Sequence, residues 1–210
     1  MKAFTVLEAV AAPMLLANVN TDTIIRAAHS GTTPREQLGR YVFEAIRLRE
    51  DGSQDPGFIL NRPSFQGAQI LIAGENFGCG SSRETAVWAM SGAGFRCVIA
   101  PSFGGIFHGN CFQNGVLAVQ LPLEVVSRLG QAILADPAQA RLRVDLERQR
   151  VTTAQGETIA FEYDPLRKQA LLQGLDDIEM TLRDVASIEA YEALDRQRRP
   201  WIQDTGLPPS

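Results

Sequence analysis

Short apolar runs alternate with polar, glycine-containing turns along much of the chain. Residues 68–73 read Ala-Gln-Ile-Leu-Ile-Ala between two glycines, a pattern that predicts a buried strand. A glycine-rich loop over 74–80 follows, and then a helix expected to begin at Ser81 and a second strand at 97–100. This order of strand, loop, helix and strand is typical of a parallel βαβ unit.

Further elements are predicted on both sides of this unit. Thr33, Pro34 and Glu36 combine an N-cap, a favoured first helical residue and a capping box, and they predict a helix through residue 46. Residues 14–30 have no clear period and are predicted as a loop that enters a short apolar segment. The other predicted elements are a strand and loop over 1–17, helices over 106–113 and from 122 to about 135, strands at 116–120, 141–147, 151–153 and 159–161, and a last helix capped by Thr181 that carries apolar Leu182, Val185, Ile188 and Tyr191. No repeat or linker divides the chain, which predicts one α/β domain.

Composition and charge exclude several classes of function. The 210 residues are 45% apolar and 21% charged, which is typical of a globular chain with a sizeable core. A net charge of -4 without a run of like charges argues against a nucleic-acid partner and against a basic membrane surface. The N-terminal apolar stretch is interrupted by Glu8 and Pro13, and no stretch is long enough to span a membrane. We therefore expect a cytoplasmic protein.

Three cysteines, Cys79, Cys97 and Cys111, are widely spaced along the chain. Their odd number and spacing fit neither a disulfide framework nor the close Cys-x-x-Cys spacing of metal sites. We expect them to be reduced and at least partly buried. A redox role for Cys79, which precedes a predicted helix N-terminus, is the less favoured alternative.

Candidate chemistry is concentrated in residues 74–84. Glycines at 78 and 80 allow a ligand to approach the backbone closely, and Ser81, Ser82 and Arg83 place hydroxyls, amide N–H groups and a guanidinium at a predicted helix N-terminus. Such a turn can bind a carboxylate, and a serine there could act as a base if the amides and Arg83 stabilised its alkoxide. The structural alternative is a capping box from Ser81 to Glu84, and the spacing alone leaves both interpretations open.

Several ordered blocks of this sequence closely resemble the small subunit of 3-isopropylmalate dehydratase, a family that corresponds to the swivelling domain of aconitase. The blocks are Phe77-Gly78-Cys79-Gly80-Ser81-Ser82-Arg83-Glu84, Asn20 to Ile25, Phe58 to Asn61, Ala100 to Phe103, Asn110 to Gly115 and Gly174 to Leu182. The resemblance covers about residues 17–201 and implies an α/β fold, a three-layer β/β/α swivelling domain with a mixed or parallel sheet. It implies a single swivel domain over 1–210, with a core at about 17–165 and a C-terminal helix and tail at about 166–210.

The resemblance also implies an activity and its partners. The family removes water from 2-isopropylmalate and adds it back to give 3-isopropylmalate, in leucine biosynthesis. This chain would be a hydro-lyase subunit, active only with a large subunit that carries a [4Fe-4S] cluster, in a heterodimer or heterotetramer. Its scattered cysteines supply no cluster ligands of familiar spacing, and we predict no metal ligand in this chain. The alternatives are a related hydratase acting on citraconate or a homoaconitate-like acid, and a non-catalytic module that binds a carboxylate.

Residue roles follow from the resemblance by position. Ser81 would be the base that takes the carbon-bound proton, and Ser82 and Arg83 would hold a substrate carboxylate. Asp22 resembles an active-site aspartate that positions catalytic groups across the subunit interface. The other expected substrate-binding residues are Gly80, Thr23, His29 and Ser30.

The sequence departs from the family pattern in the segment that follows Ile25, where the family sets its substrate specificity. The family commonly has an aromatic or aliphatic pair there, whereas this chain reads Ala27-Ala28-His29-Ser30. An isopropyl group requires apolar walls, so a smaller or more polar substrate side chain is an alternative. The family also often has aspartate at Asn20, proline at Arg26 and histidine at Thr85.

Overall fold

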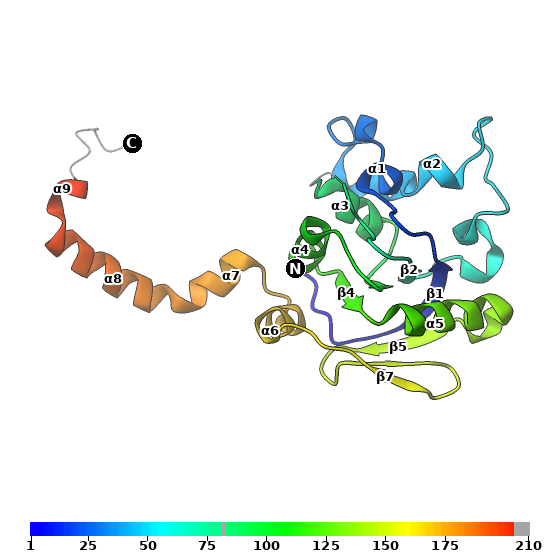
Figure 1. The fold of residues 1–210 in the computed structure, drawn as a ribbon. Helices are drawn as coiled ribbons and strands as arrows, with labels where there is room; N and C mark the ends of the chain where they lie inside the picture. Colours follow the sequence, from blue (N-terminus) through cyan, green and yellow to red (C-terminus); the bar gives the residue numbers. More distant parts are fainter. Residues whose placement is uncertain (81–82, 204–210) are drawn as a thin grey trace. The chain divides into compact units, whose positions relative to one another are not determined.

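The computed structural model describes residues 1–80 and 83–203. The chain divides into two compact units, Met1–Gly174 and Leu175–Ser210 (Figure 1). None of the helices in the described ranges combines the length and the apolarity that crossing a bilayer requires.

A mixed sheet in the order β4-β3-β2-β1-β5-β6-β7 organises the first unit. The strands are β1 Val6–Met14, β2 Ile70–Ala73, β3 Cys97–Ala100, β4 Leu117–Gln120, β5 Arg141–Asp145, β6 Arg150–Thr152 and β7 Thr158–Ala160. Strands β1 to β4 are parallel, with Ala11 opposite Ile70 and Ile70 opposite Cys97, whereas β5, β6 and β7 are antiparallel to their neighbours. The long strand β1 therefore joins a parallel half of the sheet to an antiparallel half.

The burial of the strands follows their residue pattern. Every residue of β2 and β3 is buried, as expected for short apolar strands in a parallel sheet. In β5, Arg141 and Arg143 are exposed and Leu142 and Val144 are buried, which is the alternation of a half-exposed antiparallel strand. The predicted buried strands and the predicted antiparallel meander are confirmed.

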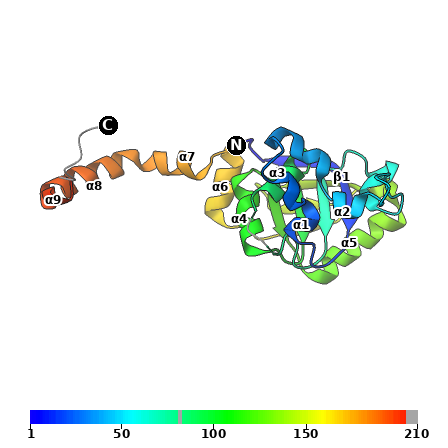
Figure 2. The ribbon, with the colours of Figure 1, turned by 90° about the horizontal axis from the view of Figure 1, so that it is seen from above.

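Helices cover the sheet and surround the loops at its parallel end. They are α1 Thr21–Ile24, α2 Glu44–Arg47, α3 Thr85–Gly92, α4 Gly105–Gln113, α5 Leu123–Ala135 and α6 Pro165–Gln173. Helix α5 packs against β1, with buried Val126, Leu129 and Ile133 on one face. Helices α1, α3 and α4 are neighbours (Figure 2). The predicted helices at 106–113 and 122–135 are confirmed.

The predicted α-helix over 34–46 is wrong. A 3-10 helix spans Arg35–Tyr41, Phe43 adopts a left-handed φ of 55°, and only then does α2 begin. Tertiary contacts explain the break, because the Phe43 N–H donates to the carbonyl of Ile24 at 2.8 Å and the Phe43 side chain is fully buried. Thr33 does not cap this segment, since its flanking residue is Pro34, which makes no side-chain cap.

The N-terminal boundaries of two other helices also differ from the predictions. Residues 14–30, predicted as a loop, contain the one-turn helix α1, capped by the Asn20 side chain, and a 3-10 turn at Ala27–His29. Helix α3 begins at Thr85 with Glu84 as its flanking residue, later than the expected start at Ser81. Ser81 itself lies outside the described residues.

The second unit contains α7 Asp177–Thr181, a 3-10 turn at Leu182–Asp184, α8 Val185–Arg198 and α9 Pro200–Gln203. The prediction that Thr181 caps the helix carrying Leu182, Val185 and Ile188 is wrong, because Thr181 makes no side-chain cap and its hydroxyl donates to the carbonyl of Asp177. A capping box is formed by Asp176 and Glu179, at the start of α7. Thr181 has helical backbone angles instead. The predicted apolar residues Leu182, Val185, Ile188 and Tyr191 are all exposed.

Candidate functional site

Three loops meet at the carboxyl ends of the parallel strands. Residues 15–20 follow β1, residues 74–80 follow β2, and residues 101–104 follow β3. Backbone hydrogen bonds connect them, from Gly78 N–H to the Val19 carbonyl at 2.7 Å and from Phe77 N–H to the Ser102 carbonyl at 3.1 Å. In open α/β sheets this edge is the usual place for a ligand.

The glycine loop, residues 74–80, needs glycine at position 78. Gly78 has a φ of +73°, and a Cβ there would lie 2.2 Å from Cγ of Phe107 on α4. The ring of Phe107 also contacts that of Phe77 edge-on, with centroids 5.4 Å apart. Gly104 packs against the same loop, because a Cβ at 104 would lie 2.5 Å from the Gly78 carbonyl oxygen. Close packing therefore fixes the path of the glycine loop on the side of α4.

The structure brings together two of the predicted site residues, Asp22 and Arg83. Arg83 Nη1 donates a hydrogen bond to Asp22 Oδ1 at 2.6 Å, across the gap between α1 and the start of α3. Asn20 fixes α1 by accepting hydrogen bonds at Oδ1 from the Thr23 N–H at 2.8 Å and the Thr23 hydroxyl at 3.0 Å. The Asp22 side chain is 55% exposed and that of Arg83 is 32% exposed. A dissolved or partner-bound carboxylate can therefore reach the Arg83 guanidinium, which has five N–H donors.

Gly80 adjoins this pair. Its φ is +91°, and a Cβ there would lie 3.5 Å from Cβ of Asn20. The N–H of Thr21, the first residue of α1, donates to the carbonyl of Cys79, the residue before Gly80, at 3.0 Å. Ser81 and Ser82, the predicted base and its neighbour, lie outside the described residues, so their roles stay predictions.

His29 and Ser30 lie in residues 27–30, which we call the specificity loop after its predicted role, and they face different neighbours. Ser30 Oγ is 3.2 Å from Thr85 Oγ1, at the first residue of α3. His29 Nε2 is 2.7 Å from Glu44 Oε2, and its ring stacks on Tyr41 with centroids 3.9 Å apart. The structure thus places Ser30 beside the helix that follows Arg83, whereas His29 is held by Glu44 and Tyr41.

Sequence reasoning missed Tyr41 and Glu44 as the partners of His29. Both lie inside the segment 34–46 that the sequence predicts as a continuous helix, and the break at residues 42–43 that brings them to His29 has no periodic pattern. The signal that could have found them is chemical, since a histidine is often oriented by a nearby carboxylate.

The cysteines do not fit a [4Fe-4S] cluster, which requires several thiolates around one centre. Cys97 and Cys111 are fully buried, and burial raises the pKa of each thiol far above its usual value. Cys79 is partly exposed. Within residues 1–80 and 83–203, no group of three or more His, Cys, Asp or Glu side chains could hold a metal ion.

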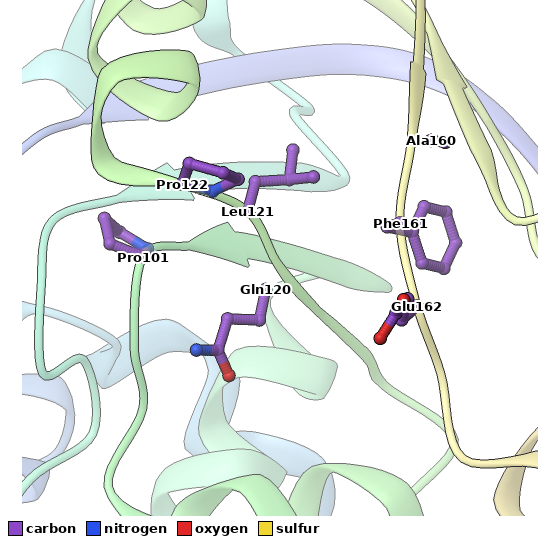
Figure 3. A pocket seen from close by; sticks show the side chains of 7 residues that line it. All are labelled: Pro101, Gln120, Leu121, Pro122, Ala160, Phe161 and Glu162. Carbon is purple, nitrogen blue, oxygen red and sulfur yellow. The ribbon is translucent and has the colours of Figure 1, made fainter.

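A separate cavity of about 710 Å³ opens next to the ends of β3, β4 and β7 (Figure 3). Its lining residues are Pro101, Gln120, Leu121, Pro122, Ala160, Phe161 and Glu162. The lining has a carboxylate and an amide but no cationic side chain, and it includes neither Asp22 nor Arg83. It therefore lacks a cationic group that would pair with a dicarboxylate, and the Asp22 and Arg83 pair is the better candidate site.

Three family models match consecutive parts of this chain. The family model described as the aconitase C-terminal domain matches residues 1–124. A model described as LeuD_N matches residues 127–165, and one described as the C-terminal domain of the 3-isopropylmalate dehydratase small subunit matches residues 177–205.

Individual proteins agree with the family models. The chain is 50% identical to the 3-isopropylmalate dehydratase small subunit of Rhodospirillum centenum over 201 residues, which covers 96% of this chain and 98% of that protein. It is 48% identical to that of Paracoccus denitrificans, with 96% and 100% covered. A crystal structure described as 3-isopropylmalate dehydratase from Methanocaldococcus jannaschii superposes with a TM-score of 0.63 at 25% identity, over 88% of this chain and 99% of that one.

Proposed function

Because this chain belongs to the family of 3-isopropylmalate dehydratase small subunits, we propose that it works with a large subunit to convert 2-isopropylmalate into 3-isopropylmalate. The resemblance found in the sequence, the α/β fold related to the aconitase C-terminal domain and the hydro-lyase class are confirmed by these matches. The reaction, the substrate and the large-subunit partner are our proposals for this chain.

The pairing of Arg83 with Asp22 is the observation that carries the proposal. A guanidinium held in place by a carboxylate on one side can present its remaining N–H donors to a substrate carboxylate in the planar, bidentate geometry that dicarboxylates favour. Asp22 lies in α1, which follows β1, and Arg83 lies in the segment that follows β2, so the pair is at the edge of the sheet where open α/β proteins usually bind ligands.

The chemistry requires one proton and one hydroxyl group to leave adjacent carbons and a water to return with the opposite orientation. We propose that Ser81, which follows Gly80 directly, takes the carbon-bound proton, and that Ser82 and Arg83 hold the adjacent carboxylate. The cysteines of this chain do not fit a cluster, so we assign the [4Fe-4S] cluster to the large subunit.

A second candidate substrate is favoured by the specificity loop. Ser30 presents a hydroxyl beside Thr85, and His29 presents an imidazole bound to Glu44, where an isopropyl group would need apolar contact. A hydratase of the same family acting on a smaller acid such as citraconate is therefore the alternative.

The test is to express the chain with a 3-isopropylmalate dehydratase large subunit from the same organism and to purify the complex anaerobically. We expect an iron-containing complex that interconverts the two isopropylmalates, while the isolated chain is folded, colourless and inactive. Arg83→Ala should bind the large subunit normally but lose most of the activity. A complex without hydratase activity on any of these acids would contradict the proposal, and so would iron-dependent activity of the isolated chain.

A further inference from the structure

Asn114, the residue that follows α4, is the centre of a polar cluster behind the candidate site. Its Oδ1 accepts hydrogen bonds from Arg35 Nη2 at 2.7 Å and from Trp88 Nε1 at 3.0 Å. Its Nδ2 donates to Glu84 Oε1 at 2.9 Å and to the Asn110 carbonyl at 2.9 Å. The amide thus uses two donors and two acceptor positions, which is its full capacity.

The partners of Asn114 belong to the segments that form the site. Glu84 follows Arg83 directly and precedes the first residue of α3, and Trp88 lies one helical turn further on. Arg35 begins the 3-10 helix that comes five residues after Ser30, and its guanidinium stacks over the Trp88 ring at 4.7 Å from the ring centroid. One side chain therefore connects the Arg83 segment with the segment that follows the specificity loop.

Only an amide satisfies this arrangement. Glu84 Oε1 accepts from both Trp88 Nε1, at 3.2 Å, and Asn114 Nδ2, so it needs a donor at 114. Arg35 and Trp88 both donate to Oδ1, so they need an acceptor at the same residue. An aspartate at 114 would keep the acceptor but would face the Glu84 carboxylate with a second negative charge in a half-buried place.

We propose that Asn114 is a positioning residue, which holds the Arg83 carboxylate-binding segment in register with the specificity loop. This inference rests on the proposed function, because it assigns Arg83 to substrate binding. Asn114 does not touch the substrate; it acts through Glu84 on one side and through Arg35 on the other.

A reversal of donor and acceptor gives a sharp test in the complete two-subunit enzyme. Asn114→Asp should lower kcat/KM for isopropylmalate at least tenfold. Adding Glu84→Gln restores a hydrogen bond of opposite polarity between residues 84 and 114 but not the one to the Asn110 carbonyl, so we expect kcat/KM to rise at least threefold above that of Asn114→Asp alone. In an Arg83→Lys background, Asn114→Asp should add less than a threefold further loss, since both changes act on the same contact with the substrate.

Asn61→Ala is the matched control. Asn61 is also half-buried and donates two hydrogen bonds through Nδ2, to the carbonyls of Arg47 at 2.8 Å and Asp55 at 2.7 Å. We expect it to lower the melting temperature but to leave kcat/KM of the assembled enzyme within twofold of the parent. A purely structural role of Asn114 would make both variants behave alike.

Fluorescence and calorimetry complete the test. When the isolated chain carries Trp201→Phe, Trp88 is its remaining tryptophan, so the emission of Trp88 reports directly on the polar cluster around Asn114. Asn114→Asp should shift this emission, and Glu84→Gln should reverse the shift.

Three results with an active parent enzyme would overturn the inference. They are a kcat/KM of Asn114→Asp within threefold of the parent, no recovery of kcat/KM when Glu84→Gln is added, and effects of Asn114→Asp and Arg83→Lys that simply multiply. An inactive parent complex that binds no isopropylmalate by calorimetry would instead contradict the proposed function, and this inference with it.

Discussion

Replacing Arg83 with lysine is expected to lower kcat/KM for every dicarboxylate substrate to a similar extent while leaving the stability of the chain almost unchanged. Lysine keeps the positive charge but cannot present two parallel N–H donors as guanidinium does. Arg83 already donates to Asp22 Oδ1 at 2.6 Å. A lysine at 83 would have to satisfy Asp22 and the substrate carboxylate from one nitrogen atom.

The expected effect on the free energy of unfolding is smaller than the effect on kcat/KM, because Arg83 has different partners in folding and in catalysis. The side chains of Asp22 and Arg83 are 55% and 32% exposed, and such an ion pair contributes about 0 to 1 kcal/mol to the free energy of unfolding. A hydrogen bond between charged groups of enzyme and substrate is worth about 1.5 to 3 kcal/mol, which corresponds to roughly a 10- to 150-fold loss in kcat/KM.

The assay measures kcat/KM of the complex for isopropylmalate and for citraconate, and urea denaturation of the isolated chain. Arg128→Lys is a matched control, because Arg128 forms an exposed bidentate pair with Glu157 at 2.6 and 2.8 Å, outside the candidate site. The control should leave kcat/KM unchanged. The reasoning is refuted if Arg83→Lys costs less than about threefold in kcat/KM, if the loss is confined to one substrate, or if the free energy of unfolding falls by more than about 2 kcal/mol.

Three further predictions test the glycine loop, a half-buried histidine and the specificity loop. Gly78→Ala should lower the free energy of unfolding in urea by more than about 1 kcal/mol, because φ is +73° and the new Cβ would overlap Phe107; an unchanged value would contradict the tight packing. The pKa of His108 is lowered in the folded chain, first by burial and then by the nearby charge of Arg167. As the pH falls below about 6.5, the histidine is therefore protonated in the unfolded chain before it is protonated in the folded chain, and stability is lost. His108→Gln should therefore reduce the loss of stability between pH 7.5 and 5.5, and an equal loss in both proteins would refute the assignment. Changing His29 to Phe and Ser30 to Leu should raise the kcat/KM ratio of isopropylmalate to citraconate by roughly 10- to 200-fold, and an unchanged ratio would show that the loop does not line the pocket.

The sequence was sufficient where burial alone decides the structure. Strands β2 and β3 are short, apolar and fully buried, and their predicted positions agree with the structure to within two residues. It was insufficient where a distant part of the chain decides the backbone. The predicted helix over 34–46 fails at Phe43, whose N–H donates to the carbonyl of Ile24. Gly39 also packs closely on Gly92, since a Cβ at position 39 would lie 2.2 Å from the carbonyl carbon of Gly92.

The same distinction separates the predictable from the unpredictable parts of the candidate site. Asp22 and Arg83 could be predicted as site residues because each occurs in a recognisable motif, but their separation of 61 residues gives no indication of the 2.6 Å contact. The contact arises because loops that follow neighbouring parallel strands end at the same edge of the sheet. His29 shows the opposite case, since its binding partner Glu44 lies inside the misassigned helix, just after the break at Phe43. A side chain in a specificity loop can thus be named from the sequence, whereas the direction in which it points depends on contacts that only the folded chain provides.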